Sequence, residues 1–233
     1  MKKLHHFLIQ HKHFYLLILL IPIHLWFEYS EQYLTPQYIT TIPFDKQIPF
    51  VPIFVVPYVL WFAFVPFGVI YVGIHSKEDY CKLFIFLFGG MVIANIIFTV
   101  FPNAQDLRPD IGSSDPFSML VKFIYTVDTP TDVCPSIHVI NSIAVNAALQ
   151  HSQSFSVKQL RKLTAHILTI LICLSTMFIK QHAVIDVGIG IIISAVFYIS
   201  LYILPTHHIK SCHLDQKEKA IDWKSNGIAI GGK

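Results

Sequence analysis

The chain has 233 residues, of which 54% are hydrophobic and only 13% are charged. Soluble domains carry about 25% charged residues, so this composition excludes a water-soluble domain, which could not cover so much apolar surface. An integral membrane protein needs no such cover, because lipid surrounds it. The formal net charge of +3 is too small to indicate a nucleic-acid-binding protein, and the length fits a single domain.

Six apolar segments follow one another along the chain, and we expect each of them to form a transmembrane helix. Spanning a bilayer takes about 20 residues, with a range of roughly 17–25, so the two shortest segments must extend into flanking polar residues. No small-residue cleavage site follows the first segment, which is therefore expected to be retained rather than removed as a signal peptide. The segments cover residues 14–29, 51–74, 83–101, 137–150, 163–179 and 184–204.

These segments predict an all-α fold, an integral membrane bundle of six transmembrane helices. Residues 1–13 form a polar N-terminal arm before the bundle, residues 14–204 form the membrane domain, and residues 205–233 form a polar tail. We expect the arm and the tail to lie on the same side of the membrane, because an even number of helices separates them.

The distribution of positive charge predicts which side that is. Thirteen of the 17 Lys and Arg residues fall in the arm, in the tail and in the segments after the second and fourth helices. The positive-inside rule therefore places both termini in the cytoplasm of a plasma membrane protein, with residues 34–50, 102–136 and 180–183 facing outward. The four basic residues on the outer side are Lys46, Arg108, Lys122 and Lys180.

The four cysteines are expected to stay unpaired. In the predicted topology Cys134 faces outward, whereas Cys81 and Cys212 lie on the reducing cytoplasmic side. No two cysteines share the oxidising side, so no disulfide is predicted.

The outward segment 102–136 is long enough to carry a helix of its own. Ser114 or Asp115 can cap this helix, and Pro116 suits its first position. The apolar residues Phe117, Leu120, Val121 and Ile124 would then share one face. We predict a short helix lying on the membrane surface, and a simple packed loop helix is the alternative.

An ionisable pair, His182 and Asp186, stands where the last apolar segment begins. Residues four apart lie on one face of a helix, so the carboxylate can accept the imidazole N–H, fix its tautomer and stabilise a cationic ring. The second ring nitrogen is then available as a nucleophile or a base. A structural pair that caps the helix is the alternative.

Two further polar segments fall on the same predicted side. Ser136 and His138 begin the fourth apolar segment, and Arg108 precedes Pro109 in the outward segment 102–136. A guanidinium matches the oxygens of a phosphate group, and a second histidine can protonate a leaving oxygen. Taken singly, Ser136 can be a helix cap and Arg108 a contact to lipid headgroups. Together with His182 they predict phosphoryl transfer.

In order and spacing, these three motifs resemble the type 2 phosphatidic acid phosphatase superfamily of six-helix membrane enzymes. That family's pattern is Lys, six residues, Arg-Pro; then Pro-Ser-Gly-His; then Ser-Arg, five residues, His, three residues, Asp. The resemblance covers roughly residues 50–204. The matching positions in this chain are Arg108-Pro109, Pro135-Ser136 with His138, and Ser175 with His182 and Asp186.

The resemblance implies a membrane lipid phosphatase that cleaves a lipid phosphate monoester or pyrophosphate at the outer face. His182 would be the nucleophile that forms a phosphohistidine, Asp186 would orient it, and His138 would protonate the leaving alkoxide. Arg108 and Ser136 would hold phosphate oxygens. The resemblance implies no metal or other cofactor. The expected partners are the lipid substrate and the membrane, with no nucleic acid and no obligate protein partner.

The chain departs from the family pattern at three positions. Phe101 stands in place of the first-motif Lys, Thr176 in place of the third-motif Arg, and Ile137 in place of the second-motif Gly. Two phosphate-binding cations are therefore missing, and Lys180 or Lys122 is the predicted substitute.

Two alternatives follow from this reduced pattern of two His and one Asp. It also resembles the sphingomyelin-synthase and inositol-phosphorylceramide-synthase branch, lipid phosphotransferases that move a phosphorylated headgroup to a lipid alcohol. The other alternative is a non-catalytic membrane protein or transporter in which the His/Asp pair serves packing or proton relay.

Overall fold

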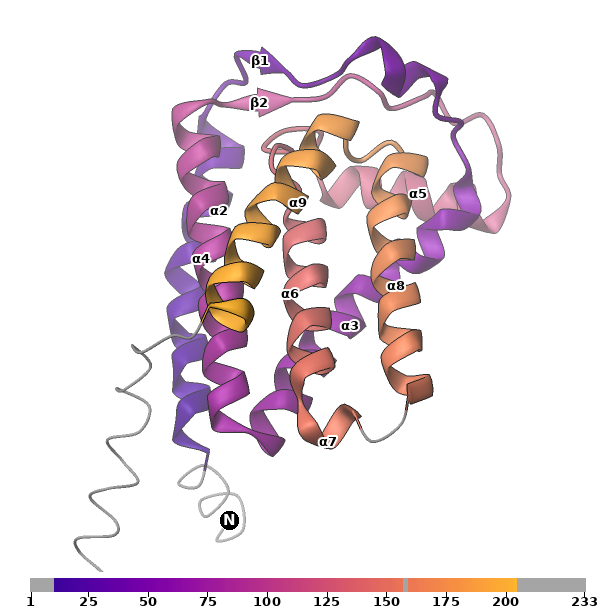
Figure 1. Cartoon of the computed structure of the whole chain (residues 1–233). Helices are drawn as coiled ribbons and strands as arrows, with labels where there is room; N and C mark the ends of the chain where they lie inside the picture. The colour runs from indigo at the N-terminus through magenta and orange to yellow at the C-terminus, as the bar shows by residue number, and fades with distance from the viewer. Residues whose placement is uncertain (1–10, 157–158, 205–233) are drawn as a thin grey trace, which may run out of the picture.

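A computed structural model of the chain describes residues 11–156 and 159–204, and it is an all-α bundle (Figure 1). The predicted tail and most of the predicted arm lie outside the described residues. The helical segments lie close to the six apolar segments of the sequence. They are η1 (Lys12–Leu19) with α2 (Leu20–Tyr33), η3 (Pro52–Phe54) with α3 (Val55–His75), α4 (Lys77–Val100), α6 (Ile137–His151), α8 (Gln159–Phe178), and α9 (Val184–Tyr198) with η4 (Ile199–Ile203).

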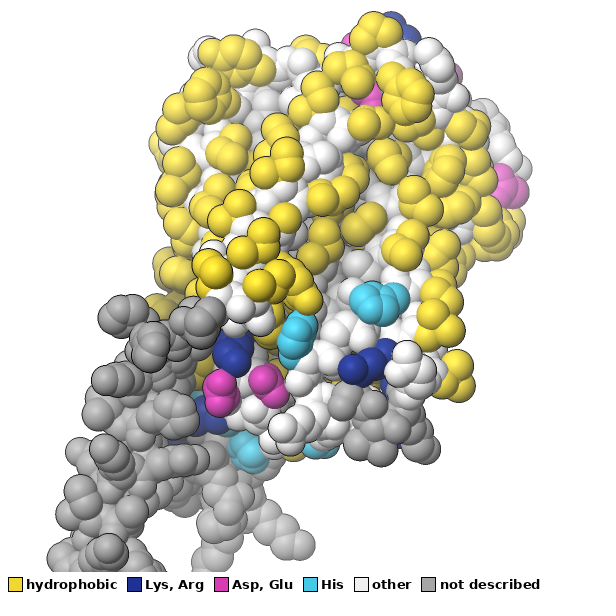
Figure 2. Space-filling view, viewed as in Figure 1, with side chains coloured by type: hydrophobic (Ala, Val, Ile, Leu, Met, Phe, Trp, Pro, Cys, Tyr) yellow, Lys and Arg dark blue, Asp and Glu magenta, His cyan; other side chains and the backbone are white. Residues whose placement is uncertain are grey.

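Among the described residues, five segments are long and apolar enough to cross a membrane. Their outward surfaces carry large apolar side chains, and Figure 2 shows this apolar surface extending along the bundle. Charged and histidine side chains gather near the lower end in the same view. This is the surface of an integral membrane protein. The five segments are Lys12–Tyr33, Pro52–His75, Lys77–Val100, Gln159–Phe178 and Val184–Ile203.

The remaining bundle helix, α6, has 15 residues, which corresponds to about 22 Å. It is therefore shorter than the roughly 30 Å hydrocarbon core that a span must cross. Ten of its 15 residues are buried, because α3, α4, α8 and α9 all pack against it. A helix enclosed by protein does not need a lipid-facing apolar surface, so small and polar residues such as Ala144, Ser142 and Asn141 occur in its buried part.

The two ends of the bundle differ (Figure 1). One end is closed by short connections, among them α7 (Gln153–Ser156). The other end carries the long connections, which include η2 (Pro43–Gln47), α5 (Pro116–Val127) and the two-residue strands β1 (Tyr38–Ile39) and β2 (Asn103–Ala104). β1 and β2 pair in parallel and tie two of these connections together. All three predicted polar segments lie at this second end.

The helix predicted within residues 102–136 is present as α5. Asp115 caps it by accepting hydrogen bonds from the backbone N–H groups of Phe117 and Ser118, at 3.0 and 3.1 Å. Val121 and Ile124 are buried on one side of α5. Phe117 is 38% exposed, which differs from the predicted apolar face. The opposite side also presents exposed apolar residues, namely Met119, Phe123 and Val127.

Two of the four cysteines can be described as thiols. Cys134 is buried and Cys173 is half-buried, and both are free. Cys212, on which part of the disulfide prediction depends, lies outside the described residues.

Close packing of α4 against α6 depends on a glycine. A Cβ added at Gly90 would lie 2.5 Å from Cγ2 of Ile140, a fully buried β-branched side chain with few alternative rotamers. At Gly188 of α9, by contrast, an added Cβ meets nothing within 4 Å.

Gly90→Ala is therefore expected to destabilise the bundle by about 1–3 kcal/mol, the usual cost of overpacking a core. Gly188→Ala is the matched control and is expected to be neutral or stabilising by up to about 1 kcal/mol, because alanine favours helix. Thermal unfolding of the detergent-solubilised protein measures both changes. Equal midpoints for the two variants would contradict this description of the α4–α6 contact.

Candidate active site

The two histidines singled out by the sequence lie next to each other. His138 is in the first turn of α6 and His182 lies two residues before α9, yet Nε2 of His182 is 3.4 Å from Nδ1 of His138. The two rings meet edge to face, with centroids 5.5 Å apart. Both side chains are buried. The fold thus brings together two imidazoles that are 44 positions apart in the chain.

Asp186 lies on the other side of the His182 ring. Its Oδ2 is 3.6 Å from Nδ1 of His182, which is a close charge contact but longer than a hydrogen bond. The same oxygen accepts the backbone N–H of Ala183 at 2.8 Å. Asp186 stands in the first turn of α9, where free N–H groups and the helix dipole stabilise a carboxylate. The carboxylate therefore fixes the start of α9 and faces the imidazole at the same time.

The starts of α6 and α9 are joined by their backbones. The N–H of Ser136, which caps α6, donates to the carbonyl oxygen of Asp186 at 3.1 Å. Gly190 permits this approach, since an added Cβ would lie 3.2 Å from the carbonyl oxygen of Ser136. The hydroxyl of Ser136 is buried near this junction and has no hydrogen-bond partner within the described part of the chain.

Arg108 reaches the same end of the bundle from the long connection before α5. Its Nη1 donates to the carbonyl of Tyr125 at 3.0 Å, and its Nη2 donates to the carbonyl of Asp128 and, at 2.6 Å, to Oε1 of Gln181. The guanidinium also lies over the Tyr125 ring, 4.3 Å from its centroid. Burial lowers the pKa of Arg108, and the Asp128 carboxylate opposes that shift. The Arg108 side chain is thus held in a defined place, where it binds the residue that precedes His182 in the chain.

A buried tyrosine connects Arg108 to the histidines. The hydroxyl of Tyr58 donates to the carboxylate of Asp128 and accepts a hydrogen bond from Nε2 of Gln181 at 3.4 Å. The Tyr58 ring packs on His138 with centroids 4.7 Å apart, and Trp61 packs on the same imidazole at 4.5 Å. The orientation of His138 is therefore fixed by aromatic contacts on α3.

Lys180 is placed differently from the other predicted site residues. Its ammonium donates to the carbonyls of Asp45 and Ile48, at 2.7 and 2.6 Å, and no hydrogen bond between described residues joins it to either histidine. Burial lowers the pKa of Lys180. Lys122, the other predicted substitute cation, is exposed on α5.

Asp45 links η2 to the segment that contains His182. This buried carboxylate accepts the backbone N–H of Val184 at 2.7 Å and that of Ile42 at 2.8 Å. Together with the ammonium of Lys180, it holds the connection 40–50 across the residues that precede α9. We call this set of contacts the Asp45 fastening.

Asn103 holds the segment that leads into α6. Its amide nitrogen donates to the carbonyls of Phe101 and Cys134, at 2.9 and 3.1 Å. Its amide oxygen accepts the backbone N–H groups of Val133 and Cys134, at 3.0 and 2.8 Å. One buried amide therefore uses its full hydrogen-bonding capacity to place the residues just before Ser136 and His138.

The structure thus brings five of the six predicted site residues to one region, namely Arg108, Ser136, His138, His182 and Asp186. Sequence reasoning missed four residues of the surrounding network. Gln181 carries a sequence signal, since it adjoins His182 in a predicted outward segment. Asp128 and Asp45 are carboxylates in the other two outward segments. Tyr58 lies inside an apolar segment and carries no such signal.

Comparison of this chain with protein-family models, with curated proteins and with solved structures finds no match. The assignment of a function therefore rests on the geometry of the site and on the motifs.

Asp45→Ala tests whether the Asp45 fastening positions His182. Removing the carboxylate leaves two backbone N–H groups without their acceptor, which typically costs about 1–3 kcal/mol for buried groups. We expect faster hydrogen exchange in residues 180–187 and a lower unfolding midpoint. Asp110→Ala removes an exposed carboxylate at the same end and is the control. Exchange in residues 180–187 that matches wild type would show that Asp45 does not hold this segment.

Proposed function

We propose that this chain is a membrane lipid phosphatase that works through a phosphohistidine intermediate. The observation that carries the proposal is the contact between His138 and His182. Asp186 faces the other ring nitrogen of His182, and Arg108 donates a hydrogen bond to Gln181, the residue just before His182. A nucleophile, a carboxylate that orients it, a proton carrier and a guanidinium are the groups that phosphoryl transfer through histidine needs. Their place at one end of an apolar bundle favours a lipid substrate.

The first chemical step is attack by His182. Its Nδ1 faces Asp186, so Nε2 is the nitrogen available to form a bond to phosphorus. As the N–P bond forms, the bond from phosphorus to the lipid oxygen breaks, and His138 gives its proton to that oxygen. Asp186 stabilises the positive charge that develops on the His182 ring.

Substrate entry has to separate the two imidazoles. In an in-line transfer the nucleophile lies about 3 Å from phosphorus before reaction, on the side opposite the leaving oxygen, which is still bonded to phosphorus and receives its proton from the acid. The two nitrogens are 3.4 Å apart in the structure, which leaves no room for a phosphoryl group in line between them. His138 is held by rings on α3, and the backbone around His182 is held by the Asp45 fastening, so we assign the movement to the imidazole side chain of His182.

The second step releases phosphate from His182. His138, now neutral, takes a proton from a water molecule, whose oxygen attacks phosphorus while the N–P bond breaks. The product is inorganic phosphate, and both histidines return to their starting protonation states. If a lipid alcohol replaced water, the same step would produce a new phospholipid.

Phosphate oxygens would be bound by Arg108 and Ser136. Among the described residues, the hydroxyl of Ser136 and the Nε atom of Arg108 are buried without hydrogen-bond partners, and so is Oδ1 of Asp186. Buried polar atoms are normally satisfied, so unpaired atoms on three of the proposed site residues support a polar ligand there. The same observation argues against the alternative of a purely structural His/Asp pair, which would satisfy its own polar groups.

A lipid phosphotransferase is the second candidate, and the charge of the site favours it. The ammonium of Lys180 is taken up by two loop carbonyls, and the carboxylate of Asp128 lies near Arg108. The site therefore offers less positive charge than a phosphate monoester would need. A phosphodiester carries less negative charge, so transfer of a phosphorylated headgroup to a lipid alcohol fits this site as well.

The proposal includes the membrane topology predicted from the sequence. With α6 counted as a sixth, enclosed membrane helix, both termini lie in the cytoplasm and the histidines face outward across a plasma membrane. The clustering of the three polar segments at one end of the bundle supports this arrangement.

His182→Gln and His138→Gln are each expected to lower turnover at least about 100-fold, because each removes a group that makes or breaks a bond. The assay measures phosphate released from phosphatidic acid, prenyl pyrophosphate or phosphatidylglycerol phosphate by the purified protein in detergent. His24→Gln, which changes an exposed histidine on α2, is the control and should retain wild-type turnover. Wild-type rates in the His182 variant would exclude the proposed nucleophile.

Hydrolysis and transfer are separated by their products. We expect free phosphate from the monoester lipids whether or not diacylglycerol or ceramide is added. A phospholipid donor that yields a new phospholipid only when the lipid alcohol is present would instead identify a phosphotransferase. No turnover of any donor would favour the non-catalytic alternative.

A further inference from the structure

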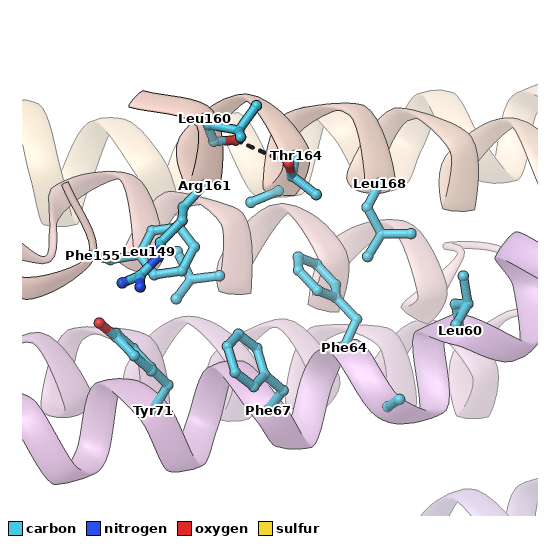
Figure 3. A pocket seen from close by; sticks show the side chains of 12 residues that line it. Leu60, Phe64, Phe67, Tyr71, Leu149, Phe155, Leu160, Arg161, Thr164 and Leu168 are labelled. Atoms are coloured by element: carbon cyan, nitrogen blue, oxygen red, sulfur yellow. Dashed lines mark hydrogen bonds between the residues drawn. The ribbon is translucent and has the colours of Figure 1, made fainter. Parts of the chain in front are cut away.

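An apolar groove lies on the bundle surface away from the histidines. It has a volume of about 760 Å³ and runs between α3 and α8, with Leu149 of α6 and Phe155 of α7 as part of its wall (Figure 3). The groove is lined mainly by aliphatic and aromatic side chains. Several of them, among them Phe67 and Leu160, are exposed on the bundle surface, so the groove is open to the lipid that surrounds the bundle.

The dimensions of the groove match one leaflet of a bilayer. Its wall on α3 extends from Leu60 to Tyr71, which corresponds to about 16 Å of helix. Half of a hydrocarbon core that is roughly 30 Å thick is about 15 Å. The groove therefore has the length of a single acyl chain that lies along the bundle within one leaflet.

A positive charge stands at one end of this groove. Arg161 projects from the first turn of α8 toward the end of the groove where Tyr71 and Phe155 lie (Figure 3). No hydrogen bond or ion pair to another described residue engages its guanidinium, and Arg161 is the one charged residue in the groove lining. This end of the bundle carries α7, so it lies opposite the end with His138 and His182. A guanidinium at the end of a chain-length apolar groove complements the phosphate of a lipid headgroup.

We propose that the α3–α8 groove binds one anionic phospholipid of the leaflet opposite the candidate active site. One acyl chain lies along α3 from Tyr71 to Leu60, and the headgroup phosphate pairs with Arg161. This site shares no residue with the proposed catalytic machinery, so it stands whether or not the chain is a phosphatase.

Native mass spectrometry of the full chain tests this site. The protein is placed in nanodiscs of equal parts phosphatidylglycerol and phosphatidylcholine, released into mild detergent, and its retained lipids are counted. Wild type is expected to retain phosphatidylglycerol about fivefold over phosphatidylcholine, the preference that one basic residue near a membrane surface typically confers. Arg161→Gln should abolish that preference. Lys162→Gln, which changes a neighbouring cation outside the groove lining, should keep it.

Bulk added inside the groove provides a second, independent test. Ala63→Phe fills the groove from α3 at an exposed position, so it should reduce retention of both lipids without unfolding the protein. Ile70→Phe adds a ring to an exposed position of α3 outside the lining and is the control. Equal retention in these two variants would overturn the site, as would equal retention of the two lipids by wild type. A mass that shows a second protein chain in place of lipid would also overturn it.

Discussion

The candidate active site depends on the meeting of two helix starts. A backbone hydrogen bond from Ser136 to Asp186 joins the first residues of α6 and α9 at 3.1 Å. His138 lies two residues beyond the donor, and His182 lies four residues before the acceptor. Once the two helix starts are joined in this way, the imidazoles face each other and the carboxylate of Asp186 lies behind one of them. A displacement of either helix by a single turn would separate His138 from His182 and Asp186.

The connections at this end of the bundle keep the junction in place through their own polar groups. The side chain of Asn103 accepts hydrogen bonds from backbone N–H groups just before α6. In the Asp45 fastening, the carboxylate accepts the backbone N–H of the first residue of α9. Arg108 and Gln181 link the connection before α5 to His182. Each of these buried polar side chains has hydrogen-bonding partners, which is what a low-dielectric environment demands. Ser136, Arg108 and Asp186 also carry buried atoms without hydrogen-bond partners among the described residues, and the proposed chemistry would use these atoms as free donors and acceptors.

The sequence predicted the helices and the pairing of the histidines for identifiable reasons. The lengths of the apolar segments indicated five membrane spans, and the Asp115-Pro116 pair indicated where α5 begins. The enclosed position of α6 could not be inferred from length, because a helix surrounded by protein follows no hydropathy rule. The hydrogen-bond partners of Lys180 could not be predicted from the sequence either. Its distance from His182 in the chain is short, but the carbonyls that receive its ammonium belong to residues more than 130 positions earlier. Tyr58 shows the same limit, since partners in a fold need not be neighbours in a sequence.

The proposed mechanism requires that His182 accept a phosphoryl group, so the decisive measurement is detection of that adduct. The purified protein is mixed with a lipid phosphate donor, quenched at alkaline pH, where phosphohistidine survives, and digested for mass spectrometry. We expect phosphate on the peptide that contains His182, its loss after brief acid treatment, and its absence from the His182→Gln variant. Turnover of the donor with phosphate on a different residue, or with no covalent adduct at any time point, would contradict it.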